Sequence, residues 1–455
     1  MNSLSKNNLF EDAPIPSAVK KLVIPTILSS LVMVLYNLAD TFFVGQLNDP
    51  VQNAAVTLVA PLMLAFNAVN NLFGVGSSSM MSRALGRKDY ETVKRSASIG
   101  LYCSVFFGIL FSLLSLIFHT PLLKLLGADA TTSEATAGYM LWTVIFGAMP
   151  SILNVVMAYL VRAEGNSMHA SIGTMSGCFL NMILDPIFIF VFNMGAAGAG
   201  IATFISNCFA CGYFLVLLYK MRKYTYISIN PKNFKPDKKV ITGIFAVGIP
   251  ASIQNLLNVI GMTVLNNLTS VYGADAVAAM GIAQKIYMVP AQIALGGTQG
   301  VMPLVSYSYS SKNFKRFKDS ISFLSVMLLP AMLLIAFIAF LTSPVLMKLF
   351  IENDAVINFG NIFFRAMICA APFLVTDFLV VGVCQAIGRG KISLAFAIFR
   401  KLVLEIPSIV VLNLIFAENG IAFGALIAEL VMSVVGFFTL LHIVRKFKKE
   451  TETCM

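Results

Sequence analysis

Long apolar stretches alternate with short polar segments along the whole chain. A helix needs about 20 apolar residues to cross roughly 30 Å of hydrocarbon, and twelve stretches reach that length. They lie at residues 18–45, 54–82, 96–118, 135–162, 168–192, 197–220, 240–270, 277–307, 320–341, 357–387, 392–416 and 420–444. Prolines within several of them are compatible with spanning helices, because packed neighbours can satisfy the carbonyls that a proline frees. The pattern predicts an all-α membrane protein with twelve transmembrane helices.

The composition agrees with a chain that lives in lipid. Hydrophobic residues make up 58% of the 455 residues and charged residues 12%, whereas soluble domains carry about a quarter charged residues. The first segment, MNSLSKNNLFEDAPIP, is polar and acidic. It lacks the pattern of a cleavable signal peptide, so we expect the first span to act as the insertion signal.

The net charge of +11 comes from basic residues that gather on one side of the predicted helices. They cluster at 83–95, 220–239 and 312–318, whereas the opposite loops hold only Lys124 and Lys348. Cytoplasmic loops carry the excess of Lys and Arg, so both termini are expected in the cytoplasm. The sequence thus predicts a multi-pass protein of the cell inner (plasma) membrane. The positive charge is then a signal of topology and not of nucleic-acid binding.

The chain contains an internal repeat. The segment GVGSSSMMSRALGRKDYETVKRS is followed 224 residues later by TQGVMPLVSYSYSSKNFKRFKDS. Ser82 therefore corresponds to Ser306, and Lys88 to Lys312. Further along the two copies, Asp185 matches Glu405 after small deletions in the loops.

Six spans in each copy predict two homologous six-helix lobes. The lobes comprise residues 1–220 and 240–455, and a cytoplasmic linker at 221–239 joins them. Because each copy has an even number of spans, the lobes share one orientation and are related by an axis along the membrane normal. Such a pair encloses a central cavity that can open to either side.

Two carboxylates of the first lobe, Asp40 and Asp185, lie in predicted spans that contain no Lys or Arg at membrane depth. An ionised carboxylate at the bilayer centre costs at least ~2.5 to 3.5 kcal/mol. An acid without a basic partner must therefore bind a proton or a cation. At 1.5 Å per residue, Asp40, Asp185 and Thr203 lie roughly 8 to 11 Å below the outer end of their spans. We expect these three residues at one level.

Polar neighbours complete this candidate site. Asn181 precedes Asp185 by one helical turn, and Tyr36 precedes Asp40 by one turn, so each pair shares a helix face. Pro186 lacks a backbone donor and loosens the helix beside Asp185. Carboxylate, amide and carbonyl oxygens together suit a proton or a small hard cation. Na⁺ at Asp40, Asn181 and Asp185 is the one metal ion that the sequence suggests.

The second lobe mixes acids with bases. Its spans contain Asp377, Glu405 and Glu429 together with Lys285, Arg365, Arg400 and Lys401. We interpret them mainly as paired structural charges, with substrate contact or a second titrating site as the alternative. The depth estimate places Lys285, Arg365, Glu405 and Glu429 in the outer half of the membrane and the other three in the inner half. We therefore predict that Glu405 or Glu429 pairs with Lys285 or Arg365.

Other chemistry finds little support in the sequence. Cys208 and Cys211 have C-x-x-C spacing but lie in an apolar helix without His or acid, which favours core packing over a metal or redox role. The three His residues fall at span ends and form no cluster. We expect no cofactor, no further metal site and no enzymatic activity, since a membrane-embedded enzyme needs a nucleophile, base or metal facing a cavity.

Three stretches resemble one known family. PTILSSLVMVLYNLADTFFVG in the first span, SRALGRKDY after the second and LNMILDPIFIF in the fifth are similar to the multidrug and toxic compound extrusion (MATE) family, in its DinF-like and MepA-like bacterial branch. The resemblance covers nearly the whole chain. It implies a V-shaped pair of six-helix bundles that exports cationic, amphipathic compounds in exchange for H⁺ or Na⁺.

The resemblance also assigns roles to particular residues. In this branch of the family, the coupling site comprises the aspartate of the first span and the Asn and Asp of the fifth. These positions match Asp40, Asn181 and Asp185. Tyr36 and Thr203 match the supporting polar positions. Another branch of the family uses acids of the second lobe, and Asp377 and Glu405 keep that option open here.

A flippase for lipid-linked saccharides is the alternative function, since it shares a related helical plan. A flippase is expected to need a basic cavity for a pyrophosphate, whereas the first lobe here is anionic. Antiport by a monomer, with small cationic or amphipathic drugs and membrane lipid as partners, is therefore the preferred hypothesis.

Overall fold

The computed structural model describes residues 9–47, 49–231 and 234–453, and all regular elements in these ranges are helical. Within them, nine helices are long and apolar enough to cross a membrane, or ten if the bent pair Ser133–Ile145 and Ala148–Ala163 counts as one span. The two remaining predicted spans correspond to one long helix, Ala274–Ser310, and to an interrupted helical run that starts at Gly390. The all-α prediction with twelve spans is confirmed. Some residues of the predicted linker and of the predicted cytoplasmic termini lie outside the described residues. They are 232 and 233 in the linker, and 1–8, 454 and 455 at the termini.

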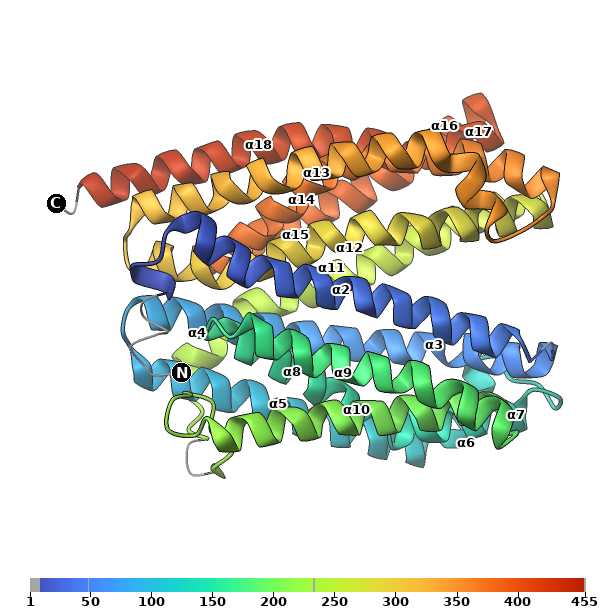
Figure 1. The fold of residues 1–455 in the computed structure, drawn as a ribbon, viewed down its shortest axis with the longest axis horizontal. Coiled ribbons are helices and arrows are strands. Elements are labelled where there is room, and N and C mark those ends of the chain that lie inside the picture. The colour runs from blue at the N-terminus through green and yellow to red at the C-terminus, as the bar shows by residue number, and fades with distance from the viewer. Residues whose placement is uncertain (1–8, 48, 232–233, 454–455) are drawn as a thin grey trace. The chain divides into compact units, whose positions relative to one another are not determined.

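Besides the helical residues 9–11, the described part of the first half forms nine α-helices and three π-helical turns, and Figure 1 labels these nine α-helices. These elements are α2 (Ile15–Gly45), α3 (Pro50–Asn70), η1 (Asn71–Val75), α4 (Gly76–Gly86), α5 (Tyr90–Ile117), α6 (His119–Leu125), α7 (Ser133–Met140), η2 (Leu141–Ile145), α8 (Ala148–Ala163), α9 (Ser167–Pro186), η3 (Ile187–Val191) and α10 (Gly195–Lys220). Three of the predicted spans therefore contain a π-helical turn.

The second half follows the same plan. Its elements are α11 (Lys238–Ser270), α12 (Ala274–Ser310), α13 (Phe314–Lys348), α14 (Asp354–Ala386), α15 (Gly390–Ile398), η5 (Phe399–Glu405), α16 (Ile406–Phe416), α17 (Glu418–Ile421) and α18 (Phe423–Glu452). The π-helical turn η5 interrupts the eleventh span. Pro407, the second residue after it, cannot donate a backbone hydrogen bond.

The backbone repeats along with the sequence. Lys88 and Lys312 are both left-handed, with φ of 59° and 58°, although non-glycine residues seldom adopt such angles. Gly165 and Gly388 also match, with φ of 83° and 81°. The same turns therefore end corresponding helices in both halves.

A buried serine contact repeats as well. Ser82 Oγ donates to the carbonyl of Ala163 at 3.3 Å, and Ser306 Oγ donates to the carbonyl of Ala386 at 2.8 Å. Each bond ties the end of one helix to the last turn of another. The internal repeat is thus visible in packing as well as in sequence.

Packing divides the chain into two compact units. The first unit comprises the residues up to Asp12 together with Leu28–Ser252, and the second comprises Ala13–Ile27 and Ile253–Met455. The units follow packing, whereas the predicted lobes follow the sequence repeat. They differ because α2 and α11 each contribute their first part to one unit and their remainder to the other.

Small residues allow close helix contact inside each unit. In the first unit, α9 packs against α8 and α10; a Cβ on Gly173 of α9 would lie 2.3 Å from the ring of Phe214 on α10. In the second unit, α14 packs against α12, α13 and α18; a Cβ on Gly382 of α14 would lie 2.3 Å from Thr298 of α12. Side chains larger than hydrogen at these two glycines would push the helices apart.

Candidate functional site

The proline after Asp185 shapes the backbone of the first candidate site. α9 ends at Pro186, and the π-helical turn Ile187–Val191 follows at once. Phe192 donates its backbone N–H to the carbonyl of Ile187 at 3.0 Å, five residues earlier. Such turns occur often at functional sites, since the extra residue reorients the side chains and backbone carbonyls around it.

Asn181 joins Asp185 to the neighbouring helix. With its amide oriented to suit the surrounding donors and acceptors, its nitrogen donates to Asp185 Oδ2 at 2.9 Å. Its oxygen then accepts from the backbone N–H of Thr203 at 3.0 Å and from Thr203 Oγ1 at 3.3 Å. Asp185 is fully buried, with 0% exposure, and Asn181 is 2% exposed. The one-turn spacing thus gives α9 a bonded amide–carboxylate pair that is held against α10.

α2 brings the second carboxylate to the same place. The Tyr36 hydroxyl is hydrogen-bonded to the side chain of Thr203. Asp40, one turn further along α2, lies close enough to Asp185 for their charges to interact. Both residues belong to the part of α2 that packs in the first unit. The structure therefore brings together all five residues of the predicted first-lobe site.

The acids of this site lack a basic partner. In the ranges that the structure describes, no Lys or Arg forms an ion pair with Asp40 or Asp185. Among the same residues, the Oδ1 atoms of both acids are buried without a hydrogen-bond partner. Two adjacent carboxylates in a low dielectric cannot both stay ionised without a counter-ion. The arrangement can therefore hold a proton or a small cation, and no described cluster of three or more His, Cys, Asp or Glu suits a metal ion.

The sequence analysis missed further members of this network. Tyr139 on α7 lies close enough to Asp40 and Asp185 to interact with both, and it is 3% exposed. Asn207 donates to the carbonyl of Thr203 at 3.0 Å and accepts from the side chain of Asn154 at 3.3 Å. A Tyr within the predicted apolar span 135–162 was the available signal for Tyr139. Asn154 connects to the site through Asn207.

A different arrangement fills the second unit. Arg400 on η5 forms ion pairs with Asp377 of α14, 3.0 Å from Nη1 to Oδ2, and with Glu429 of α18. Lys401, the next residue, pairs with Glu405 one turn later at 2.6 Å. All three acids are at most 6% exposed. Two built-in cations thus neutralise most of the charge of the three second-unit acids.

The predicted partners of these acids were wrong. Glu429 and Glu405 pair with Arg400 and Lys401 instead of Lys285 or Arg365. The depth estimate placed Arg400 and Asp377 in the inner half of the membrane and Glu429 in the outer half, yet Arg400 pairs with both acids. Boundary errors of a few residues and the long reach of arginine decide which charges meet. The π-helical turn further shifts the helical register across Phe399–Glu405.

The two bases with wrongly predicted partners have other environments. The guanidinium of Arg365 lies over the ring of Phe340, 4.9 Å from its centroid. Lys285 on α12 is exposed. A cation over an aromatic face gains about 0.5–2 kcal/mol, so Arg365 has a structural role. Lys285 stays a candidate for contact with substrate or lipid.

The comparisons with known proteins come to the same family. The family model described as MatE matches residues 25–187 and 250–411, once in each copy of the repeat. The Multidrug export protein MepA of Staphylococcus aureus (strain MRSA252) is 32% identical over 422 residues, which cover 92% of each chain.

Two solved structures resemble the fold closely. One is described as the outward-facing conformation of a multidrug resistance MATE family transporter of the MOP superfamily; it is 26% identical, with a TM-score of 0.93 and coverage of 99% of this chain and 100% of that one. The other, a crystal structure of MATE in complex with MaL6, is 26% identical with a TM-score of 0.92, covering 98% and 99% of the two chains. The likeness extends over both copies of the repeat.

Proposed function

The chain belongs to the MatE (multidrug and toxic compound extrusion) family, and from this premise we propose that it exports cationic, amphipathic drugs in exchange for H⁺ or Na⁺. Like other members of the family, it is a secondary transporter and not an enzyme. The relatives named as multidrug export proteins support the substrate class. The coupling ion is proposed to bind in the first unit.

One observation carries this proposal: Asp40 and Asp185 lie close enough for their charges to interact, and among the described residues neither forms an ion pair with a Lys or Arg. Such a pair gains free energy by binding a cation or proton, because either one removes the repulsion between the carboxylates. Asn181 and Thr203 supply the remaining oxygens that a small cation needs. The same anionic character disfavours the alternative function, a flippase for a lipid-linked saccharide whose pyrophosphate would be repelled.

Coupling then follows from differential affinity. In the state with neither proton nor Na⁺ bound, the excess negative charge attracts a cationic drug. Protonation of one carboxylate, or Na⁺ bound between them, removes that attraction and weakens drug binding. By linkage, the drug weakens binding of the coupling ion by the same factor. Each ligand thereby shifts the equilibrium between the two access states.

The second-unit acids have a structural role in this proposal. Arg400 and Lys401 already neutralise most of their charge, so a mobile cation gains less there than at Asp40 and Asp185. Asp377, Glu405 and Glu429 would then hold α14, η5 and α18 together. If these acids contacted the substrate instead, Glu405→Gln or Asp377→Asn would lose export.

The test is efflux from vesicles that contain the purified protein, with each gradient imposed separately. A pH gradient alone and a Na⁺ gradient alone are compared for their ability to drive out ethidium. We expect one of the two gradients to drive export, and the Asp185→Asn protein to respond to neither. Export of ethidium that is independent of both gradients would contradict the proposed antiport.

We further propose that the protein lies in the plasma membrane as a monomer, with both termini in the cytoplasm. The distribution of Lys and Arg supports this orientation. Impermeant thiol reagents added outside cells should label Asp275→Cys and spare Asp237→Cys. The opposite labelling would invert the topology.

A further inference from the structure

The turn between α8 and α9 holds a segment that precedes the first span. Gly165 in this turn has φ of 83°, which favours glycine. A Cβ there would lie 2.9 Å from Cζ of Phe10. The ring of Phe10 is 1% exposed, so it is packed directly against the backbone of the turn.

An ion pair adds to this docking. Glu11 lies 3.3 Å from the ammonium of Lys88, which sits in the turn between α4 and α5. Both contacts lie within the first unit. The buried ring of Phe10 and the ion pair of Glu11 therefore help to attach residues 9–12 to the first unit, and we call these residues the N-terminal latch.

The chain changes unit directly after the latch. Ala13 belongs to the second unit, and its carbonyl accepts a hydrogen bond from Arg316 Nη1 at 2.8 Å. Arg316 is 8% exposed and lies in the first turn of α13. Two consecutive residues, Asp12 and Ala13, are thus attached to different units.

The linker between the two halves behaves differently. The carboxylate of Glu164, in the same α8–α9 turn, accepts hydrogen bonds from Thr225 Oγ1 at 2.9 Å and from the Tyr226 N–H at 2.7 Å. The ring of Tyr226 stacks on Tyr90 with 5.2 Å between centroids. Linker residues therefore dock on the same turn as the latch does.

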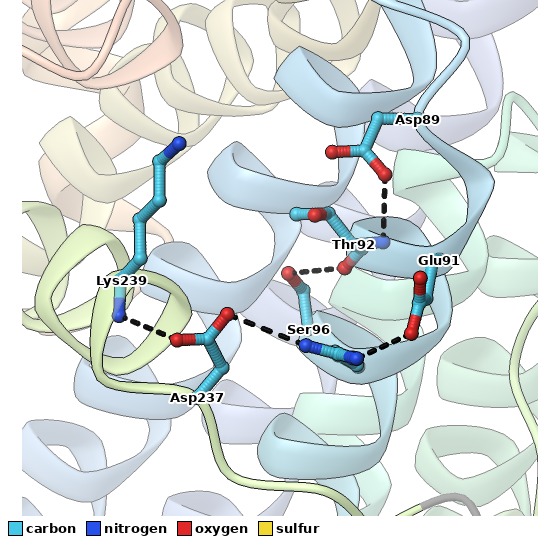
Figure 2. A network of polar contacts seen from close by, with 7 residues as sticks. Asp89, Glu91, Thr92, Ser96, Asp237 and Lys239 are labelled. Atoms are coloured by element: carbon cyan, nitrogen blue, oxygen red, sulfur yellow. Dashed lines mark hydrogen bonds and ion pairs between the residues drawn. The ribbon is translucent and has the colours of Figure 1, made fainter.

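The end of the linker is held by the polar network in Figure 2. Asp237 accepts from the backbone N–H of Lys239 at 3.0 Å and from Arg95 at 3.3 Å, and Arg95 also pairs with Glu91. The chain then enters α11, whose first part up to Ser252 belongs to the first unit as well. The described linker residues are consequently fixed to one unit from end to end.

The chain passes between units at three places: after Asp12, after Ile27 inside α2, and after Ser252 inside α11. The last two passages lie within continuous helices, whose hydrogen-bond ladders resist local change. Residues 12–14 have no regular hydrogen-bonded structure. Any movement of one unit against the other therefore acts first on the attachment of the latch.

We propose that the N-terminal latch undocks from the α8–α9 turn in each transport cycle, whereas the linker stays docked. Docking of Phe10 and Glu11 then stabilises one of the two access states, and their release is a step toward the other. This proposal concerns a conformational step and not the identity of the drug or of the coupling ion. The proposed export of drugs is used only as the readout of the first test.

The first test joins the latch to its dock. Glu11→Cys/Lys88→Cys is bridged with a short bifunctional methanethiosulfonate, and linked peptides are identified by mass spectrometry to exclude the native cysteines. We expect bridging to slow ethidium export by about tenfold or more, as for a blocked conformational step, and reductant to restore it. Export at the unbridged rate would overturn the proposal.

The matched control joins the linker to the same unit. Arg95 and Asp237 are also 3.3 Å apart, so Arg95→Cys/Asp237→Cys is bridged with the same reagent. Export should stay within about twofold of the unbridged protein, because the two positions move as one body. An equal loss in this pair would mean that bridging itself inhibits, and the latch would lose its distinct role.

The second test does not depend on export. The rate of bridging between positions 11 and 88 is measured in detergent with Phe10 intact and with Phe10→Ala. Loss of the ring should slow bridging several-fold, since the segment then spends less time docked. Tyr90→Ala, which removes the ring that stacks on the linker, should leave this rate unchanged. An unchanged rate in Phe10→Ala would show that the ring does not hold the latch.

Discussion

The two units share one repeated framework but treat their buried acids in opposite ways. In the first unit, Asp40 and Asp185 lie close enough for their charges to interact, and their polar neighbours are neutral. In the second unit, Arg400 lies between Asp377 and Glu429 and forms ion pairs with both. Built-in cations pair with one group of acids, whereas the other group has no ion-pair partner among the described residues and is proposed to bind the coupling ion.

The contrast shows how a duplicated scaffold can divide its work. Asp185 and Glu405 occupy matching positions in the repeat, yet Glu405 has gained Lys401 one turn earlier. A single basic residue at this spacing gives Glu405 an ion pair that Asp185 lacks among the described residues. Substitutions of the acids and bases in each unit should therefore have different effects on export and on stability.

The largest effect is expected from neutralising the first-unit acids. Asp185→Asn and Asp40→Asn are nearly isosteric and should leave the protein folded and inserted. They should abolish gradient-driven export of ethidium, because the network would no longer change charge with the coupling ion. Export from vesicles, at equal amounts of reconstituted protein, measures the loss.

Variants of the second unit supply the control for this experiment. Glu405→Gln should retain gradient-driven export, since Glu405 is already paired with Lys401. If Asp40→Asn and Asp185→Asn export normally while Glu405→Gln or Asp377→Asn does not, the coupling site belongs to the second unit.

A smaller but still large effect is expected on stability from Arg400→Gln. It leaves Asp377 and Glu429 buried without their cation, and breaking a buried pair in this way costs about 3–5 kcal/mol. Thermal unfolding in detergent measures the loss. Arg400→Leu combined with Glu429→Leu should recover part of it, because fewer unpaired charges remain.

The exposed ion pair between Arg95 and Asp237 is the matched control for Arg400. Its side chains are 29% and 41% exposed, and such pairs contribute about 1 kcal/mol or less. Arg95→Gln should therefore lower stability far less than Arg400→Gln. Equal losses in the two variants would contradict a special role for the buried cluster.

The smallest effect on stability is expected from Lys285→Ala. Lys285 is exposed and does not pair with Glu405 or Glu429, so unfolding should change by no more than about 0.5 kcal/mol. A loss of several kcal/mol in the free energy of unfolding would instead favour the pairing of Lys285 with Glu405 or Glu429 that was predicted from depth. A change in export without a change in stability would instead indicate contact with substrate.

The sequence predicted the first-unit arrangement because the relevant information is local. One-turn spacing places Asn181 beside Asp185 and Tyr36 beside Asp40, and a constant rise per residue brings Thr203 to the same depth. The structure brings these five residues together, while their role in coupling stays a prediction. The number and order of the spans follow from equally local patterns of apolar residues.

The second-unit pairing depends on information that is not local. Whether Glu429 meets Arg400 or Lys285 depends on how three helices are rotated and on the extra residue in η5. Hydrophobic periodicity does not reveal a π-helical turn. Tyr139 was missed for a similar reason, since it joins the site through the packing of α7 and carries no charge in the sequence.

The exchange of helix parts between α2 and α11 makes neither half of the gene self-sufficient. A fragment that ends in the linker carries residues 13–27, which pack in the second unit, and it lacks 238–252, which complete the first. Each half, if translated separately, would lack a helix segment that completes its own unit. It would also carry a helix segment that packs in the other unit. Each copy of the repeated sequence therefore contributes helix segments to both units. Both halves of the chain must be present before either unit can complete its folding.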